Sequence, residues 1–173
     1  AFAIDISVHT ANVGDEGVEG YLKIFTEMDQ PKVEQVMRDF NQNRASRIAQ
    51  KTLAYEVTKL IHGEDQANKQ VKIAEAIANQ SLQGLDDTEV ATLREEMPHT
   101  TAQPGQDVAD LLLQTALASS KTDARRLVAE NAISINGQKA RKERLEESDF
   151  QNGRLFIRKG KAFKDSALIE LNQ

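Results

Sequence analysis

The chain of 173 residues contains no cysteine and no tryptophan, and it has only three prolines. Without cysteine it can form no disulfide bond and no metal or catalytic site that depends on a thiolate. It also lacks an apolar run long enough to cross a membrane, and it begins without the pattern of a signal peptide. These absences predict a cytoplasmic protein with no membrane partner.

The net charge of −5 hides an uneven distribution of charge along the chain. Residues 1–118 hold 10 Lys and Arg against 19 Asp and Glu, whereas residues 119–173 hold 12 against 8. An acidic body with a basic end is typical of a protein that contacts nucleic acid through one end. The sequence therefore predicts a nucleic-acid contact within residues 119–173.

Apolar residues recur at helical spacing from Tyr21 to about Glu96, which predicts an all-helical first part. Before it, the segment Asn12–Gly20 is polar and holds three glycines, so we expect a loop there. Prolines, a glycine and threonines without periodicity predict a linker over residues 98–106. The predicted organisation is a helical domain over 1–97, the linker, and a second domain over 107–173.

Residues 118–137 carry the clearest local signal in the chain. Ser120 can cap a helix, and Asp123 three residues later can complete a capping box. Asn131 tolerates the left-handed backbone conformation that ends a helix. An alternating strand then leads into Asn136–Gly137, which predicts the tight turn of a hairpin.

Three cations lie around the first turns of this predicted helix: Lys121, Arg125 and Arg126. A helix N-terminus offers free backbone N–H groups and a partial positive charge. The planar guanidinium group of arginine matches the oxygens of a phosphate. The cluster therefore predicts a clamp for nucleic-acid phosphates. The alternative is a solvated helix face whose charges only aid solubility.

Two further groups of cations follow in the sequence. Arg158, Lys159 and Lys161 are predicted to form a second edge of the RNA contact, although a lysine at a strand edge can serve only to prevent aggregation. A predicted loop that also carries several glutamates holds weaker candidates: Lys139, Arg141, Lys142 and Arg144.

No set of residues in the sequence predicts catalysis or metal binding. His9 and His99 have no partner at the spacing of metal ligands, and His62 is expected to end a helix. Adjacent carboxylates face apart on a helix and are poorly placed for acid–base chemistry. No serine has a base at local spacing, and the glycines form no phosphate loop. We therefore expect no catalytic residue, no metal and no cofactor in this chain.

The run Ala118–Val128, followed by Ile133–Gly137, resembles the small RNA-binding domain first described in ribosomal small-subunit protein S-four. The resemblance extends to the end of the chain. It implies an α+β fold, in which an all-helical first domain is followed by a domain with helices packed on a short β-sheet. It also implies that Lys121, Arg125 and Arg126 face RNA.

Two segments of the helical half, Gly20–Thr26 and Ala49–Glu64, resemble those that follow the catalytic core in bacterial-type tyrosyl-tRNA synthetases. That family has the same order of a helical anticodon-region domain, a linker and an S-four-like domain. The resemblance does not include residues 1–19. Because the chain lacks the family's two ATP-handling signatures and starts without methionine, we expect a fragment, namely the tRNA-binding C-terminal portion of such a synthetase.

The resemblance implies that tyrosine tRNA is the partner, recognised through shape and phosphates. The helical domain would lie near the anticodon, and the S-four-like domain where the anticodon stem meets the long variable arm. ATP and tyrosine would bind only in the absent catalytic domain, which would also form a homodimer, so this fragment should be an inactive monomer. Two alternatives stay open: a general RNA-binding accessory protein of the S-four-like superfamily, and a protein-interaction module that uses the acidic helical half.

Overall fold

The computed structural model describes residues 13–172, which combine helices with one five-stranded sheet. The predicted α+β class is therefore confirmed. The chain forms two compact units, and the division falls between Lys72 and Ile73, inside helix α5 (Glu64–Asn79). Among the described helices, none is both long and apolar enough to cross a membrane.

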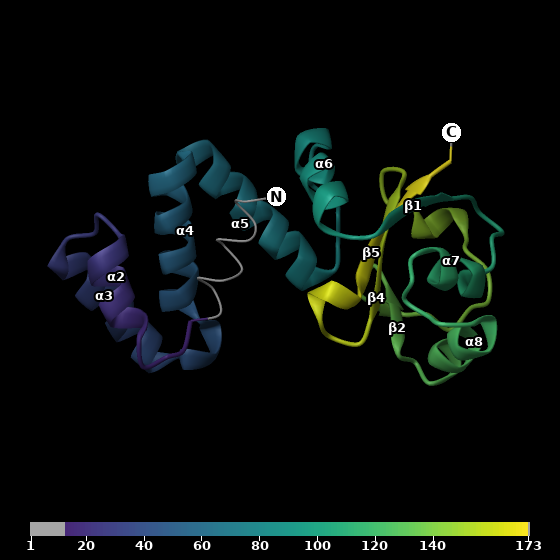
Figure 1. Ribbon diagram of the computed structural model, residues 1–173, viewed down its shortest axis with the longest axis horizontal. Helices are drawn as coiled ribbons and strands as arrows, with labels where there is room; N and C mark the ends of the chain where they lie inside the picture. The colour runs from purple at the N-terminus through teal and green to yellow at the C-terminus, as the bar shows by residue number, and fades with distance from the viewer. Residues whose placement is uncertain (1–12, 173) are drawn as a thin grey trace. The chain divides into compact units, whose positions relative to one another are not determined.

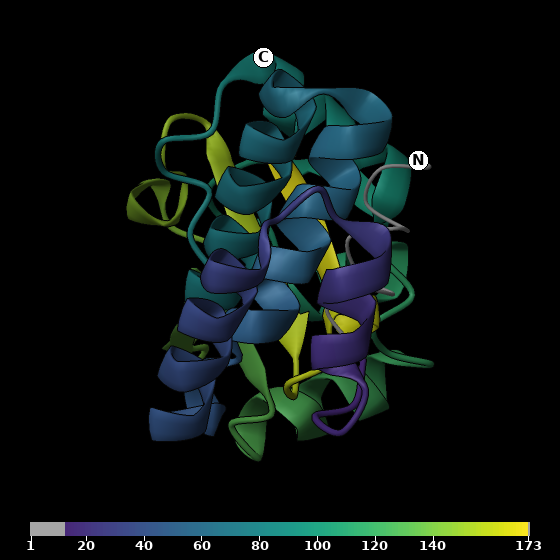
Figure 2. The same ribbon diagram turned by 90° about the vertical axis from the view of Figure 1, so that its left-hand side faces the viewer.

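The first unit is all helical, as predicted. It contains α2 (Val18–Phe25), α3 (Gln30–Gln42), the short 3-10 helix η1 (Arg44–Ser46), α4 (Ile48–His62) and the first half of α5. Figure 2 shows α2 and α3 side by side in purple and blue, in front of α4. Their inward faces share one apolar core: Val18, Leu22, Val33, Phe40, Ala49 and Leu53.

The ends and the outer surface of α2 and α3 add detail to this unit. Helix α2 begins at Val18, so it takes in the end of the loop predicted over Asn12–Gly20, and Asn12 lies outside the described residues. The Asp29 side chain accepts a hydrogen bond from the Lys32 backbone N–H and caps α3. On the outer face of α2, Tyr21, Ile24 and Phe25 are all exposed apolar side chains.

The second unit is built around the sheet, whose strand order is β1-β5-β4-β2-β3. Strand β1 runs parallel to β5, and the other neighbouring pairs are antiparallel. After the second part of α5, its elements in chain order are α6 (Asp87–Glu96), β1 (His99–Ala102), α7 (Val108–Gln114), α8 (Lys121–Ala129), β2 (Ile133–Ile135), β3 (Gln138–Lys139), η2 (Glu147–Asp149), β4 (Arg154–Lys159), η3 (Phe163–Asp165) and β5 (Ser166–Leu171).

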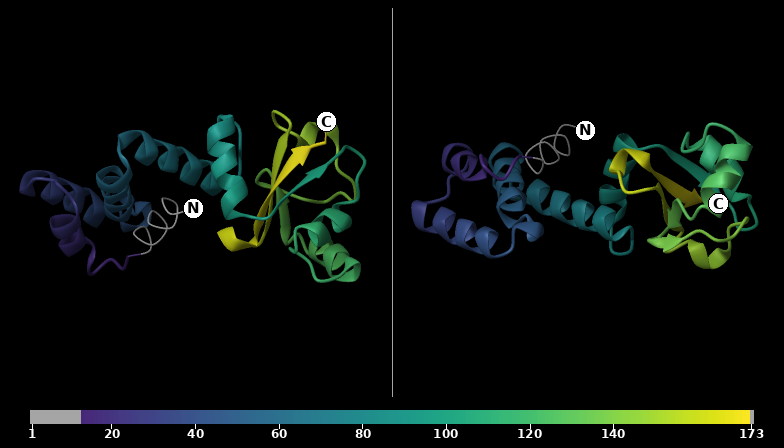
Figure 3. Two further views of the ribbon diagram at one scale, coloured as in Figure 1. Left: turned by 45° about the horizontal axis from the view of Figure 1, so that its top comes forward. Right: turned by 90° about the horizontal axis from the view of Figure 1, so that it is seen from below.

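Helices cover both faces of this sheet. Figures 1 and 3 place α7 and α8 on one side and α6 on the other. Leu155 and Ile157 of β4 belong to the core under α7 and α8, whereas Phe156 between them points to the opposite face and is also fully buried. A strand buried on both faces reads as a continuous apolar run, which explains the Leu-Phe-Ile sequence of β4.

The structure differs from the predicted linker over 98–106. Residues His99–Ala102 form β1, which pairs with β5 in the sheet. The carbonyl oxygens of Pro98 and Ala102 accept hydrogen bonds from Leu168 and Asn172, at 3.0 and 2.8 Å. The sequence looked irregular because β1 is short and lies at the edge of the sheet, where only one side is paired. Both β1 and α6 lie in the second unit, whereas the sequence placed the residues of α6 in the first domain, over 1–97.

Two ion pairs fasten α6 to the sheet. The Arg94 guanidinium group donates two hydrogen bonds to the Glu170 carboxylate of β5, at 2.6 and 2.7 Å. Arg154 of β4 pairs with Asp87 at the start of α6. Asp86 caps the same helix in a full capping box with Glu89.

The Glu170 pair predicts a pH-dependent contribution to stability. The hydrogen bond and charge of Arg94 hold the pKa of the Glu170 carboxyl below its usual value. Such a group stabilises the fold above its unfolded-state pKa and loses this contribution as pH falls through the folded-state value. We expect Glu170→Gln to lower the free energy of unfolding at pH 7 by about 1 kcal/mol. The difference between the two proteins should shrink as pH falls below the usual glutamate pKa of about 4.3 and should vanish only below the lowered folded-state pKa.

Urea titrations of both proteins at pH 7 and pH 3 measure this difference. Glu147→Gln is the matched control, because its exposed side chain has no partner among the described residues. An equal loss of stability in both variants at pH 7 would exclude the Arg94 pair as the cause.

The predicted hairpin turn is confirmed. Asn136 and Gly137 both have positive φ, of 46° and 78°, as a type I′ turn requires. The Asn136 side chain also donates to the Asp149 carbonyl oxygen at 2.7 Å and accepts from the Phe156 N–H at 2.8 Å. This residue therefore shapes the turn and joins it to β4 and η2.

Substitution of Asn136 separates these two contributions. Asn136→Ala removes both side-chain hydrogen bonds and leaves a residue that tolerates the left-handed region less well than asparagine, so we expect a loss of about 2–3 kcal/mol in unfolding free energy. Asn136→Gly loses the same hydrogen bonds without the steric cost and should be about 1 kcal/mol more stable than the alanine variant. Chemical denaturation measures both, and equal losses would contradict a steric contribution.

Candidate nucleic-acid interface

The N-terminus of α8 is the first part of the predicted clamp. Ser120 caps the helix, because its hydroxyl oxygen accepts from the Asp123 N–H at 3.1 Å. The Asp123 carboxylate does not complete the box with the Ser120 N–H as predicted. It accepts from the backbone N–H and the hydroxyl of Ser119, both at 3.1 Å. The predicted capping box is therefore wrong, because the Asp123 carboxylate contacts Ser119, one residue before the cap, and not the Ser120 N–H.

This arrangement places a negative charge at the start of α8. The hydrogen bond from the Ser119 N–H lowers the pKa of Asp123 most, and the hydrogen bond from Arg126 lowers it further. The carboxylate is therefore ionised at neutral pH. The first turn thus already carries an anion of its own. A phosphate would have to be held here by side chains rather than by the backbone N–H groups alone.

Two of the three predicted cations on α8 have carboxylate partners. The Lys121 ammonium group lies 2.6 Å from Asp110. Arg126 pairs with both Asp123 and Glu130, at 2.7 Å each, and these contacts raise its pKa. Exposed pairs of this kind contribute little to stability, so a phosphate can replace the carboxylates. Arg126 would nevertheless have to give up two partners.

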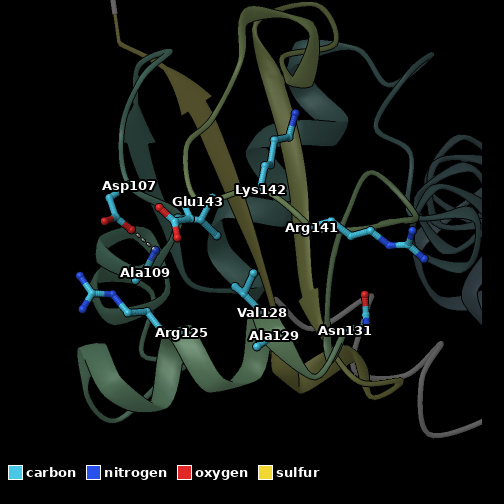
Figure 4. Close-up of a pocket in the computed structure, with 10 residues that line it drawn as sticks. Asp107, Ala109, Arg125, Val128, Ala129, Asn131, Arg141, Lys142 and Glu143 are labelled. Atoms are coloured by element: carbon cyan, nitrogen blue, oxygen red, sulfur yellow. Dashed lines mark hydrogen bonds between the residues drawn. The ribbon is translucent and has the colours of Figure 1, made fainter.

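Arg125 differs from its neighbours, because its guanidinium group has no hydrogen bond or ion pair within residues 13–172. It lines a surface pocket of about 620 Å³. The start of α7, the outer face of α8 and the loop after β3 form its walls, with these lining residues: Asp107, Val108, Ala109, Arg125, Val128, Ala129, Asn131, Arg141, Lys142 and Glu143. Figure 4 shows their side chains.

Arg141 is the second exposed guanidinium group of this pocket. Like Arg125, it has no partner within the described part of the chain. In Figure 4 the two arginine side chains extend in opposite directions, with Val128 and Ala129 between them. The pocket therefore combines two guanidinium groups that have no ion-pair partner among the described residues, two carboxylates and an apolar surface.

Backbone hydrogen bonds hold the loop of Arg141 against α7. The Val108 N–H donates to the Glu143 carbonyl oxygen at 2.8 Å, and the Leu145 N–H donates to Gln106 at 2.9 Å. The Arg144 guanidinium group donates to the Gly105 carbonyl oxygen at 2.8 Å. These bonds give the loop a fixed position, so the spacing of the two arginines is set by the fold.

Most other cations of this loop are already engaged. The Lys142 ammonium group lies 2.8 Å from both Glu146 and Asp149. Partial burial lowers the pKa of Lys142, but the two carboxylates outweigh burial and raise it overall. Lys139 on the edge strand β3 is exposed.

The three cations of the second predicted group lie in different surroundings: Arg158 and Lys159 in strand β4, and Lys161 in the turn after it. Strand β4 lies between β5 and β2, so Arg158 and Lys159 are not at a sheet edge. The Lys159 ammonium group donates to the Leu117 carbonyl oxygen at 3.0 Å, and the Arg158 Nε atom is buried. Only Lys161, in the turn after β4, is fully exposed. The Gly160 N–H donates to the Ala132 carbonyl oxygen at 2.9 Å and keeps this turn beside the end of α8.

The arrangement thus brings together Arg125 and Arg141, of which only the first was a leading sequence candidate. The sequence alone does not show which cation of this loop is neutralised. Only the folded loop brings Glu146 and Asp149 next to Lys142 rather than Arg141. Within residues 13–172, no group of three or more acidic, histidine or cysteine side chains is placed to hold a metal ion.

Comparisons with known proteins agree on one family. Residues 89–164 match the family model described as the tyrosine–tRNA ligase SYY-like C-terminal domain. The tyrosine–tRNA ligase of Clostridium perfringens (strain SM101 / Type A) is 38% identical over 154 residues, which cover 87% of this chain and 35% of that protein. The tyrosine–tRNA ligase of Mycoplasma capricolum subsp. capricolum is 34% identical over 153 residues, which cover 87% and 37%.

Among solved structures, a C-terminally truncated mitochondrial tyrosyl-tRNA synthetase from Aspergillus nidulans is 33% identical, with a TM-score of 0.43. The similarity covers 43% of this chain and 21% of that chain. The chain thus spans 35–37% of the length of the curated relatives it matches.

Proposed function

We propose, since this chain belongs to the C-terminal portion of the tyrosyl-tRNA synthetase family, that it binds tyrosine tRNA for aminoacylation by the rest of a tyrosine–tRNA ligase. ATP and tyrosine would bind in the part of the ligase outside this chain, and that part would also form the homodimer. This chain would then be an inactive monomer on its own, and the ligase would act in the cytoplasm.

One observation carries the RNA-binding proposal: Arg125 and Arg141 line the same pocket without carboxylate partners among the described residues. An exposed, uncompensated guanidinium group can meet a phosphate without first breaking an ion pair. Two such groups held on either side of one pocket suit the repeated phosphates of an RNA backbone. Both lie in the basic end of the chain, residues 119–173.

Other cations would add to this contact. Lys121 and Arg126 lie on the same helix as Arg125 and can exchange their exposed carboxylate partners for phosphates. Lys161 is exposed and lies in the turn held beside the end of α8. We assign Lys159 mainly to structure, because its ammonium group is committed to the Leu117 carbonyl oxygen.

Salt-dependent titration tests these assignments. We expect Arg125→Ala/Arg141→Ala to weaken binding of tyrosine tRNA and to reduce the log–log salt slope by about 1.4–1.8, the loss of two phosphate contacts. Arg126→Ala is the matched control on the same helix, and it should change the slope less because two carboxylates already compensate its charge. Fluorescence titration from 50 to ~300 mM salt measures all three proteins.

The outcomes separate the proposal from its rivals. A double variant with an unchanged slope would place the RNA elsewhere on the chain. Equal affinity for a tRNA that lacks the long variable arm would favour a general RNA-binding accessory role. Absence of binding by the wild-type chain, even at low salt, would contradict an RNA contact by this portion and favour a protein-interaction role for the acidic helical half of the sequence.

A further inference from the structure

The pocket between α7, α8 and the loop after β3 offers more than positive charge. Its volume of about 620 Å³ falls within the usual range of small-molecule sites. Val108 is buried in its wall, while Val128 is half-buried and Ala129 exposed on the face of α8. Phosphate contacts alone need no such apolar surface, whereas the flat face of a nucleobase does.

Glu143 supplies the polar group of this pocket. Its side chain is exposed and has no partner within residues 13–172, and its carbonyl oxygen is fixed by the Val108 N–H. Asp107, the other carboxylate of the pocket, already accepts from the Ala109 N–H at 2.7 Å. Figure 4 shows the Glu143 carboxylate on the same side of the pocket as Arg125.

A free carboxylate selects among nucleobases by its hydrogen-bonding capacity. An ionised carboxylate only accepts hydrogen bonds, through two oxygen atoms. The Watson–Crick edge of guanine presents two adjacent donors, N1–H and the exocyclic amine, and these match both oxygens. Adenine, cytosine and uracil each place an acceptor beside their donor on that edge, so they can satisfy only one oxygen.

We propose that this pocket holds an unpaired guanine of the bound RNA. The Glu143 carboxylate accepts from its N1–H and exocyclic amine, the base lies against Val128 and Ala129, and the arginines on either side contact the flanking phosphates. An unpaired base is required because a base pair would already occupy the Watson–Crick edge, and unpaired bases are the usual targets of sequence-specific RNA recognition. The inference rests on the proposed tRNA-binding function and adds a base contact to it.

Nuclear magnetic resonance titration with nucleoside 5′-monophosphates tests the pocket directly. We expect guanosine monophosphate to shift the backbone amide signals of Val128, Ala129 and Glu143 and to bind about fivefold more tightly than the other three nucleotides, the low end of discrimination by a bidentate base contact. Glu143→Gln should abolish this preference. Glu147→Gln is the matched control on a nearby exposed glutamate and should retain it. Unchanged amide signals outside the pocket confirm that the variants fold.

Titration with tyrosine tRNA separates this inference from the proposed function. Glu143→Gln should weaken tRNA binding about fivefold with no loss of salt slope, because no phosphate contact is removed. A guanine-specific pocket is overturned if the four nucleotides bind equally or if inorganic phosphate alone produces the same shifts. It is also overturned if Glu143→Gln strengthens tRNA binding, as simple removal of a negative charge would. If the wild-type chain still binds tyrosine tRNA in those cases, the proposed function is retained and only the guanine pocket is overturned. If the wild-type chain does not bind tyrosine tRNA, the proposed function itself is contradicted.

Discussion

Burial of β4 on both faces is the constraint on which the second unit depends. Leu155, Phe156 and Ile157 are fully buried in succession, so the strand needs a helical layer on each side. The cores of α7 and α8 cover one face. The other face requires α6, which is why a helix that belongs to the helical run in the sequence folds with the sheet.

The same constraint decides which cations are available to a ligand. Lys159 at the end of β4 is committed to the Leu117 carbonyl oxygen. Arg94 and Arg154 are likewise committed, through Glu170 and Asp87, to holding α6 in place. Arg158 of β4 has no side-chain partner within residues 13–172, but its Nε atom is buried. In the described part of the second unit, the exposed arginines without partners lie away from the central strand, on α8 and on the loop after β3.

The sequence predicts the local features of this region well. The Ser120 cap, the left-handed Asn131 and the Asn136–Gly137 turn all follow from residues next to one another in the chain, and all are present. Helical spacing likewise predicts the helices of the first unit. These signals succeed because they depend on backbone geometry and immediate neighbours.

Features that depend on distant residues could not be predicted in the same way. Strand β1 is defined by its pairing with β5, some 70 residues later, rather than by its own composition. The commitment of Lys142 depends in the same way on Asp149, across a loop. The sequence could therefore identify a basic region but not which of its cations remain without a partner.

Net charge alone is a poor guide to such a contact. The whole chain is negative, so its long-range field opposes RNA, and attraction must come from groups that touch the phosphates. Salt screens charges beyond about 10 Å at 0.1 M, which weakens the repulsion from the acidic residues 1–118 as well as the local attraction. An acidic protein can thus bind RNA at moderate salt provided that a few cations are left without internal partners. Because Lys121 and Arg126 are paired with carboxylates, Arg125 is the cation on α8 that can meet a phosphate without first breaking an ion pair.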